Sequence, residues 1–249
     1  MRHIPEFTQL NLPSKLEICF PEATDVEREN AGSIRNKMKF DSDLLPYMED
    51  IIRGMRLTKG LTTYVEVGTY DKGCLAYVSD LLSPEAIIVD IDISENEAQE
   101  LKLRNYLKPS QRYHKIVGDS TANSTVQKIS DIIGPDGADI IFIDANHIAE
   151  YVWNDVGLYF PLLAQNGILL VHDILWSGDD SHFGSDRAIE WIDKFLPVLC
   201  IEGTKPIYRY FPSFSKSESH WGVLGVILNS FKKKREISTV AWAGIEPAT

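Results

Sequence analysis

The sequence predicts a doubly wound α/β fold, in which helices cover both faces of a mostly parallel sheet. Five short runs rich in Val and Ile follow one another, and segments of helical length separate them. Strands of this kind, alternating with helices, are typical of parallel sheets, because right-handed crossovers place helices on both faces. With 249 residues, the chain can bury such a sheet in one domain. The runs are TTYVEVG (62–68), EAIIVDIDI (85–93), YHKIVGDS (113–120), ADIIFIDA (138–145) and GILLVHDI (167–174).

The segments around these five runs complete the predicted domain. Residues 1–40 contain prolines without a sustained period and are expected to form an irregular or partly helical lead-in. Residues 41–55 have apolar side chains at helical spacing behind a capping Asp or Ser. After a predicted helix at 186–196, three apolar runs leave no room for helices, which indicates an antiparallel hairpin finishing the sheet. The domain is therefore expected to span 41–231, followed by a disordered tail at 232–249. The three apolar runs are VLCIEG (198–203), IYRYF (207–211) and WGVLGVIL (221–228).

Composition excludes several classes of function. Lys plus Arg number 25 and Asp plus Glu number 36, so the net charge is 25 − 36 = −11, which repels nucleic-acid phosphates and anionic lipid. The three cysteines are widely spaced, as expected in a reducing cytosol. No run approaches the ~20 apolar residues of a membrane span. We expect a cytoplasmic protein that binds neither nucleic acid nor membrane.

Each of the five predicted strands ends in an acidic residue. In a doubly wound sheet, ligands bind outside the carboxyl ends of the strands. A single acid at such a position is often only a helix N-cap, but five in succession are hard to assign to capping alone. The predicted ligand site is therefore lined by Glu66, Asp90 with Asp92, Asp119, Asp144, and His172 with Asp173.

Two glycines bracket the turn after the first strand. Gly68 and Gly73 form a GxxxxG pattern, whereas a dinucleotide-binding GxGxxG would need a glycine where Tyr70 stands. A diphosphate would also face Glu66 and Asp71. A cationic ligand that contains a ribose suits these acids better.

The ordered set YVEVGTYDKG, IIVDIDI, VGDS and DIIFIDANH...GILLVHDIL resembles the motifs of class I S-adenosylmethionine-dependent methyltransferases. Within that family it is most similar to the branch of macrolide sugar O-methyltransferases and cephalosporin hydroxylase proteins. The resemblance covers about residues 60–230. It implies a Rossmann-like sheet of seven strands with an antiparallel C-terminal hairpin, and S-adenosylmethionine as cofactor.

The resemblance also implies roles for particular residues. Asp90 would bind the ribose, as the 24-residue step from Glu66 favours, although Asp92 is a competing choice. Asp119 and Ser120 would lie against the adenine. The methionine part of the cofactor would be held by Glu66, Gly68, Thr69, Tyr70 and Gly73.

Asp144 and His147 place a carboxylate and an imidazole where a strand gives way to a helix. A hydroxyl that accepts a methyl group needs a base, a metal ion, or both. By resemblance, His147 is the general base, and Asp144 binds Mg²⁺ with an acidic pair after the next strand. That pair is His172 and Asp173 here, and an imidazole favours Mn²⁺ or Fe²⁺ over Mg²⁺. The alternatives are that His147 only caps its helix and that His172 only satisfies a backbone group.

The predicted function is O-methylation of a hydroxyl on a small molecule or sugar. The rivals are a nicotinamide-dependent oxidoreductase on a related fold and a binding protein that retains the cofactor pocket without turnover. The sequence is compatible with a homo-oligomer. It contains no motif that identifies the methyl acceptor.

Overall fold

The computed structural model describes Ile52, residues 60–173, Gly178 and residues 182–188, together with the backbone of 207–211 and 224–228. The expected lead-in, most of the helix at 41–55, the run at 198–203 and the tail at 232–249 lie outside this part of the chain.

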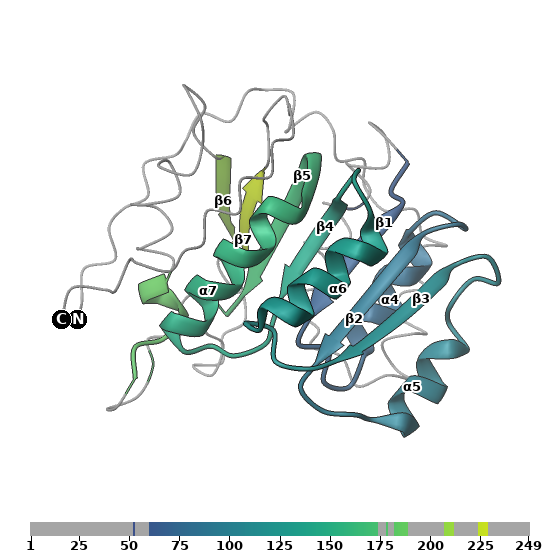
Figure 1. Cartoon of the computed structure of the whole chain (residues 1–249), viewed down its shortest axis with the longest axis horizontal. Coiled ribbons are helices and arrows are strands. Elements are labelled where there is room, and N and C mark those ends of the chain that lie inside the picture. Colours follow the sequence, from purple (N-terminus) through teal and green to yellow (C-terminus); the bar gives the residue numbers. More distant parts are fainter. Residues whose placement is uncertain are drawn as a thin grey trace.

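The described strands form one sheet in the order β3-β2-β1-β4-β5-β7-β6 (Figure 1). The first five strands are parallel, whereas β7 pairs antiparallel with both β5 and β6. The mostly parallel sheet predicted from the sequence is therefore confirmed. The strands are β1 (Thr63–Val67), β2 (Ile87–Asp92), β3 (Arg112–Val117), β4 (Ala138–Ile143), β5 (Leu163–His172), β6 (Ile207–Phe211) and β7 (Leu224–Leu228).

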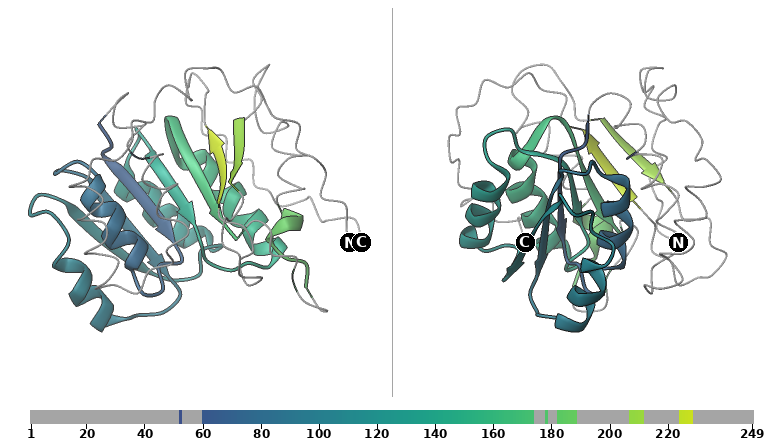
Figure 2. Two further views of the ribbon diagram at one scale, coloured as in Figure 1. Left: turned by 180° about the vertical axis from the view of Figure 1, so that it is seen from behind. Right: turned by 90° about the vertical axis from the view of Figure 1, so that its right-hand side faces the viewer.

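Helices cover both faces of this sheet (Figure 2). Helices α4 (Gly73–Leu81) and α5 (Glu97–Arg104) pack on one face, where Tyr64, Ile88 and Phe142 form the core beneath them. Helices α6 (Asn123–Ile133) and α7 (Ala149–Tyr159) cover the other face, over a second core. The alternation of side chains along each strand supplies both cores. A short 3₁₀ helix, η1 (Phe160–Leu162), joins α7 to β5. None of the helices in the described residues is long and apolar enough to span a membrane.

The chain reverses its winding direction between β1 and β4. Strands β1, β2 and β3 extend the sheet to one side of this point, and β4 and β5 extend it to the other. Because β1 and β4 are neighbours, Glu66 lies beside Asp90 on one side and Phe142 on the other. Loops that leave the carboxyl ends of β1 and β4 in opposite directions open a crevice for ligands.

Candidate active site

The turn after β1 is pressed against the end of β4. Gly68 has a φ of +87°, a conformation that side chains disfavour. A Cβ at this position would lie 2.2 Å from the Asp144 carbonyl oxygen. The Asp144 amide donates to the Val67 carbonyl at 2.8 Å, and the Gly68 amide donates to Ile91 at 2.8 Å. Only glycine therefore fits where the backbones of three strands meet.

Glu66 lies beneath this turn and is 1% exposed. The Tyr64 hydroxyl donates to its Oε2 at 2.6 Å. Burial raises the pKa of Glu66 to about 8; the Tyr64 bond opposes this shift, and the carboxylates of Asp90 and Asp144 add to it. At neutral pH most Glu66 side chains therefore carry a proton.

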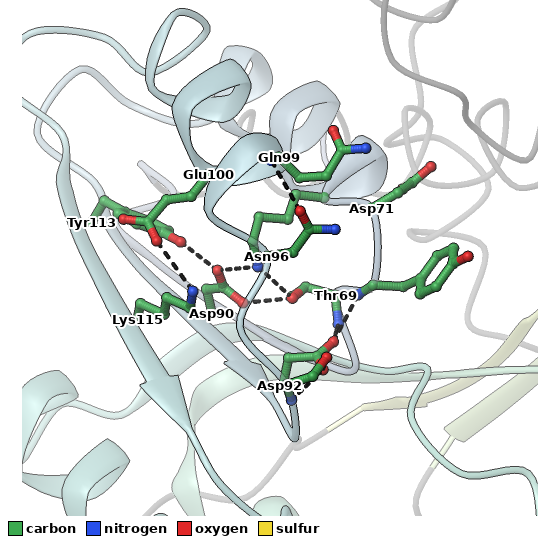
Figure 3. Close-up of polar contacts among 12 residues, drawn as sticks. Thr69, Asp71, Asp90, Asp92, Asn96, Gln99, Glu100, Tyr113 and Lys115 are labelled. Atoms are coloured by element: carbon green, nitrogen blue, oxygen red, sulfur yellow. Dashed lines mark hydrogen bonds and ion pairs between the residues drawn. The ribbon is translucent and has the colours of Figure 1, made fainter.

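Asp90 is also fully buried, at the centre of a polar network (Figure 3). Its Oδ1 accepts a hydrogen bond from the Thr69 hydroxyl at 2.6 Å. Its Oδ2 accepts from the Tyr113 hydroxyl and pairs with Lys72 Nζ at 2.6 Å. Lys72 is itself 1% exposed, so the two charges compensate each other inside the protein. This carboxylate holds the turn in place from beneath and is not exposed.

Asp92 lies two residues further along β2, at the carboxyl edge of the sheet. Its Oδ2 accepts from the backbone amides of Thr69 and Tyr70, at 3.1 and 2.8 Å. Its Oδ1 accepts from the amide of Ser94 at 2.9 Å and from its hydroxyl at 3.1 Å. Burial raises the pKa of Asp92, but hydrogen bonds from the Ser94 and Tyr70 amides and from the Ser94 hydroxyl, together with the Lys72 charge, bring it below its ordinary value. Asp92 is thus an ionised acceptor, and the Ser94 hydroxyl is the donor that can rotate away for a ligand.

The loop after β3 contains Asp119 and Ser120. Asp119 is exposed, and its Oδ1 accepts from the Thr121 amide at 2.9 Å and the Thr121 hydroxyl at 2.8 Å. The Ser120 carbonyl accepts from the Tyr159 hydroxyl on α7 at 2.9 Å. The loop is therefore fixed both from within and by α7.

Four side chains converge beyond β4 and β5, namely Asp144, His147, His172 and Asp173. One ligand atom from each can be chosen so that all four lie within 4.8 Å of one another. His172 Nδ1 lies 3.0 Å from Asp144 Oδ1 and 3.4 Å from Asp173 Oδ2. His147 Nε2 lies 3.2 Å from the same Asp144 oxygen and 3.5 Å from the same Asp173 oxygen. The ring nitrogens and carboxylate oxygens thus alternate around a common centre.

The backbone at Asp173 makes this convergence possible. Successive side chains of a strand point to opposite faces, so His172 and Asp173 would ordinarily diverge. Asp173 has a φ of 49°, in the left-handed region that Asp tolerates better than most residues. The Ser185 hydroxyl donates to the Asp173 carbonyl at 2.6 Å and stabilises this conformation. Backbone strain of this kind is concentrated at functional sites.

The charges of Asp144 and His172 shift each other's pKa. Burial lowers the pKa of His172, but the neighbouring Asp144 and Asp173 carboxylates together outweigh burial and raise that pKa to about 10. Burial likewise raises the pKa of Asp144, and the His172 and His147 rings bring it below its ordinary value. Asp144 is therefore an ionised carboxylate beside a His172 ring that carries a proton.

The structure places the predicted residues at the carboxyl edge of the sheet in three groups. Gly68, Thr69 and Tyr70 form the turn, Asp119 and Ser120 lie in the neighbouring loop, and Asp144 joins the turn to the cluster through its backbone. Sequence reasoning missed Lys72, because a lysine in a polar turn is expected at the surface. It also missed Tyr113, which lies inside a strand and shows no special spacing.

Comparisons with known proteins agree with this architecture. Residues 65–174 match the family model described as a methyltransferase domain. An O-methyltransferase from Bacillus cereus, solved with S-adenosylhomocysteine, is 16% identical with a TM-score of 0.55, over 83% of this chain and 90% of that one. The O-methyltransferase TomG from Streptomyces achromogenes, solved with S-adenosylmethionine and involved in tomaymycin synthesis, is 14% identical with a TM-score of 0.51, over 85% and 91%.

A protein from Clostridium thermocellum, provisionally named an rRNA methylase, is 15% identical with a TM-score of 0.55, over 78% of this chain and 99% of that one. No curated protein sequence matches the chain. At these identities the solved structures show the fold, and the family model supplies the class of enzyme.

Proposed function

We propose that this chain, which belongs to the class I S-adenosylmethionine-dependent methyltransferases, transfers the methyl group to a hydroxyl of a small molecule or sugar. The observation that carries the proposal is the contact between the Gly68 turn and Asp144. The residue that packs against the cofactor turn also directs its carboxylate at His147. A methyl donor held by the turn and a hydroxyl held at the cluster would therefore be neighbours. The methyltransferase family match disfavours the nicotinamide-dependent alternative.

The cofactor assignment follows the geometry of the strand ends. The turn from Gly68 to Gly73, with Glu66 beneath it, would bind the methionine part. We assign the ribose to Asp92 in place of Asp90, because Asp90 is fully buried, whereas Asp92 is partly exposed at the edge of the sheet. Asp119 and Ser120 would lie against the adenine, with Asp119 Oδ2 available for its amine.

In this proposal the Asp144–His147 pair removes the proton from the acceptor. His147 Nε2 and Asp144 Oδ1 are 3.2 Å apart, and both side chains are about a quarter exposed. A neutral imidazole can accept the proton, and the carboxylate stabilises the charge that results. His172 is less exposed, at 11%, and is better placed to position Asp144 than to contact an acceptor. Asp144, His172 and Asp173 have the donors to hold a divalent cation, such as Mg²⁺ or Mn²⁺, that assists.

Binding calorimetry tests the cofactor part of the proposal. S-adenosylmethionine and S-adenosylhomocysteine should bind with one site per chain, whereas NAD should not bind. Asp92→Asn should weaken S-adenosylhomocysteine binding, and Asp131→Asn, an exposed acid on α6, is the matched control. Normal affinity in Asp92→Asn would remove Asp92 from the ribose site.

Turnover tests the reaction. A panel of sugars, phenols and other hydroxyl compounds should contain at least one that drives release of S-adenosylhomocysteine, with the added methyl group found on oxygen. Methylation on nitrogen or carbon would overturn O-methylation, and tight cofactor binding without turnover on any acceptor would favour the binding-protein alternative.

A further inference from the structure

We infer that Asp155 on α7 is a positioning residue for the cofactor: its ionised carboxylate accepts a hydrogen bond from the Ser120 hydroxyl and so fixes the loop that would hold the adenine. The inference deepens the proposed function and rests on it, because that function places the adenine against Asp119 and Ser120. It adds a residue that lies behind the binding surface and would not itself touch the cofactor.

Asp155 is a buried acid without an adequate partner. Its side chain is 0% exposed, and neither carboxyl oxygen makes a hydrogen bond of normal geometry with the residues that the structure describes. An unpaired buried polar group costs free energy, so its presence in a native protein needs an explanation. Packing alone would favour an apolar side chain here, as at Val152 and Val156 on the same helix. The acid therefore indicates a polar role.

Asp155 lies beside the two residues of the proposed adenine loop. Tyr159 follows four residues later on the same face of α7, and its hydroxyl donates to the Ser120 carbonyl at 2.9 Å. Asp155 itself interacts with the side chains of Ser120 and Asp119. A hydroxyl rotates to suit its acceptor, so a small shift of the loop toward α7 would complete a bond from Ser120 to Asp155. Helix α7 would then hold Ser120 at both its carbonyl and its hydroxyl.

The protonation state of Asp155 decides how strong this contact is. Burial raises the pKa of Asp155 to about 7; the Ser120 side chain opposes this shift, and the Asp119 carboxylate adds to it. Tyr159 stays neutral, because burial and the Asp155 and Asp119 charges raise its pKa. An ionised carboxylate accepts a stronger hydrogen bond than a protonated one. Adenine that holds the loop against α7 should therefore favour ionised Asp155, so cofactor affinity should rise with pH through about 7.

Binding calorimetry with S-adenosylhomocysteine from about pH 5.5 to pH 8 tests the inference on the full chain with Asp155→Asn. The amide has nearly the same shape and cannot titrate. Glu66, which titrates at the upper end of this range, is present in both proteins, so its effect cancels in the ratio of their affinities. Across the range the wild type should gain on the order of 10-fold relative to the variant, the factor for a shift of one pKa unit on binding. Asp131→Asn, exposed on α6, is the matched control and should follow the wild type.

A second ligand separates positioning from a purely structural role. S-inosylhomocysteine has a carbonyl oxygen in place of the adenine amine, so it lacks the contact assigned to Asp119. The wild type should prefer S-adenosylhomocysteine, and Asp155→Asn should reduce this preference at pH 8. Ser120→Ala removes the other half of the contact and should cause the same loss, and combining the two substitutions should add little. If Asp155→Asn does not fold, Ser120→Ala is compared with the wild type in its place.

Two results would overturn this inference alone. One is a ratio of wild-type to variant affinity that stays constant across the pH range. The other is equal weakening of both ligands in the variant, which would leave Asp155 with a structural role only. If the wild type does not bind S-adenosylhomocysteine at all, the proposed function is refuted together with the inference.

Discussion

Glu66→Gln should change how stability depends on pH. In the native state burial holds the pKa of Glu66 at about 8, whereas its ordinary value is 4.5. The unfolded chain therefore releases a proton that the native protein keeps, and stability falls as pH rises from about 4.5 and levels off above about 8. One pKa unit corresponds to about 1.4 kcal/mol, so this group alone should lower the free energy of unfolding by on the order of 3 kcal/mol between about pH 5 and pH 8.

The glutamine variant cannot titrate and should not show this loss. Its amide oxygen can still accept the hydrogen bond from the Tyr64 hydroxyl, which now reaches Glu66 Oε2 at 2.6 Å. Urea unfolding of both proteins across this pH range gives the difference in free energy at each pH, and all other titrating groups cancel. The free energy of unfolding of the variant, relative to that of the wild type, should increase steadily as pH rises. A difference that stays constant would show that Glu66 is ionised in the folded protein.

Three further predictions concern the turn and the cluster. Lys72→Met leaves the buried Asp90 carboxylate uncompensated and should lower the free energy of unfolding by about 3–5 kcal/mol. A Lys72→Met, Asp90→Leu double variant should recover most of this loss. Equal stability of the single variant and the wild type would contradict the buried ion pair. Gly68→Ala should lower the free energy of unfolding by at least about 1–3 kcal/mol in the same assay, because the new Cβ would meet the Asp144 carbonyl and φ at this position is left-handed. If the variant is as stable as the wild type, the turn can shift to accept the side chain. His147→Ala should reduce turnover on the order of 10² to 10⁴-fold with unchanged S-adenosylhomocysteine affinity. Near-normal turnover would show that His147 is not the general base; it is not a helix cap either, because Ile148 is the N-cap of α7.

The fold was predictable because the alternation of apolar strands with helical segments is repeated along the chain. Five buried strands separated by helical segments indicate one architecture, and the parallel arrangement then brings the strand ends to one edge. The proximity of Asp144 to His147 and His172 follows from that edge and from local spacing.

The choice of ribose acid stays a prediction, because Asp90 and Asp92 point to the same face of β2 and differ only in depth. Spacing along the chain favours Asp90. How deeply each acid is buried depends on where the β1 turn crosses above β2, which spacing does not give. Lys72 is the donor that neutralises the deeper acid, and a sequence pattern gives no reason to bury a lysine. Nor does periodicity reveal the left-handed backbone at Asp173, which turns its side chain toward His172.

Asp144 links the β1 turn to the histidine cluster. Its amide and carbonyl lie against the β1 turn, while its carboxylate belongs to the histidine cluster. A displacement of the end of β4 would therefore carry the donor side and the acceptor side along together and preserve their spacing. Thermal motion of the sheet should therefore change the distance between the proposed donor and acceptor sites by less than the sheet itself moves. Under the proposed function, a new acceptor could be accommodated by altering other segments, while Asp144 would keep the alignment needed for transfer.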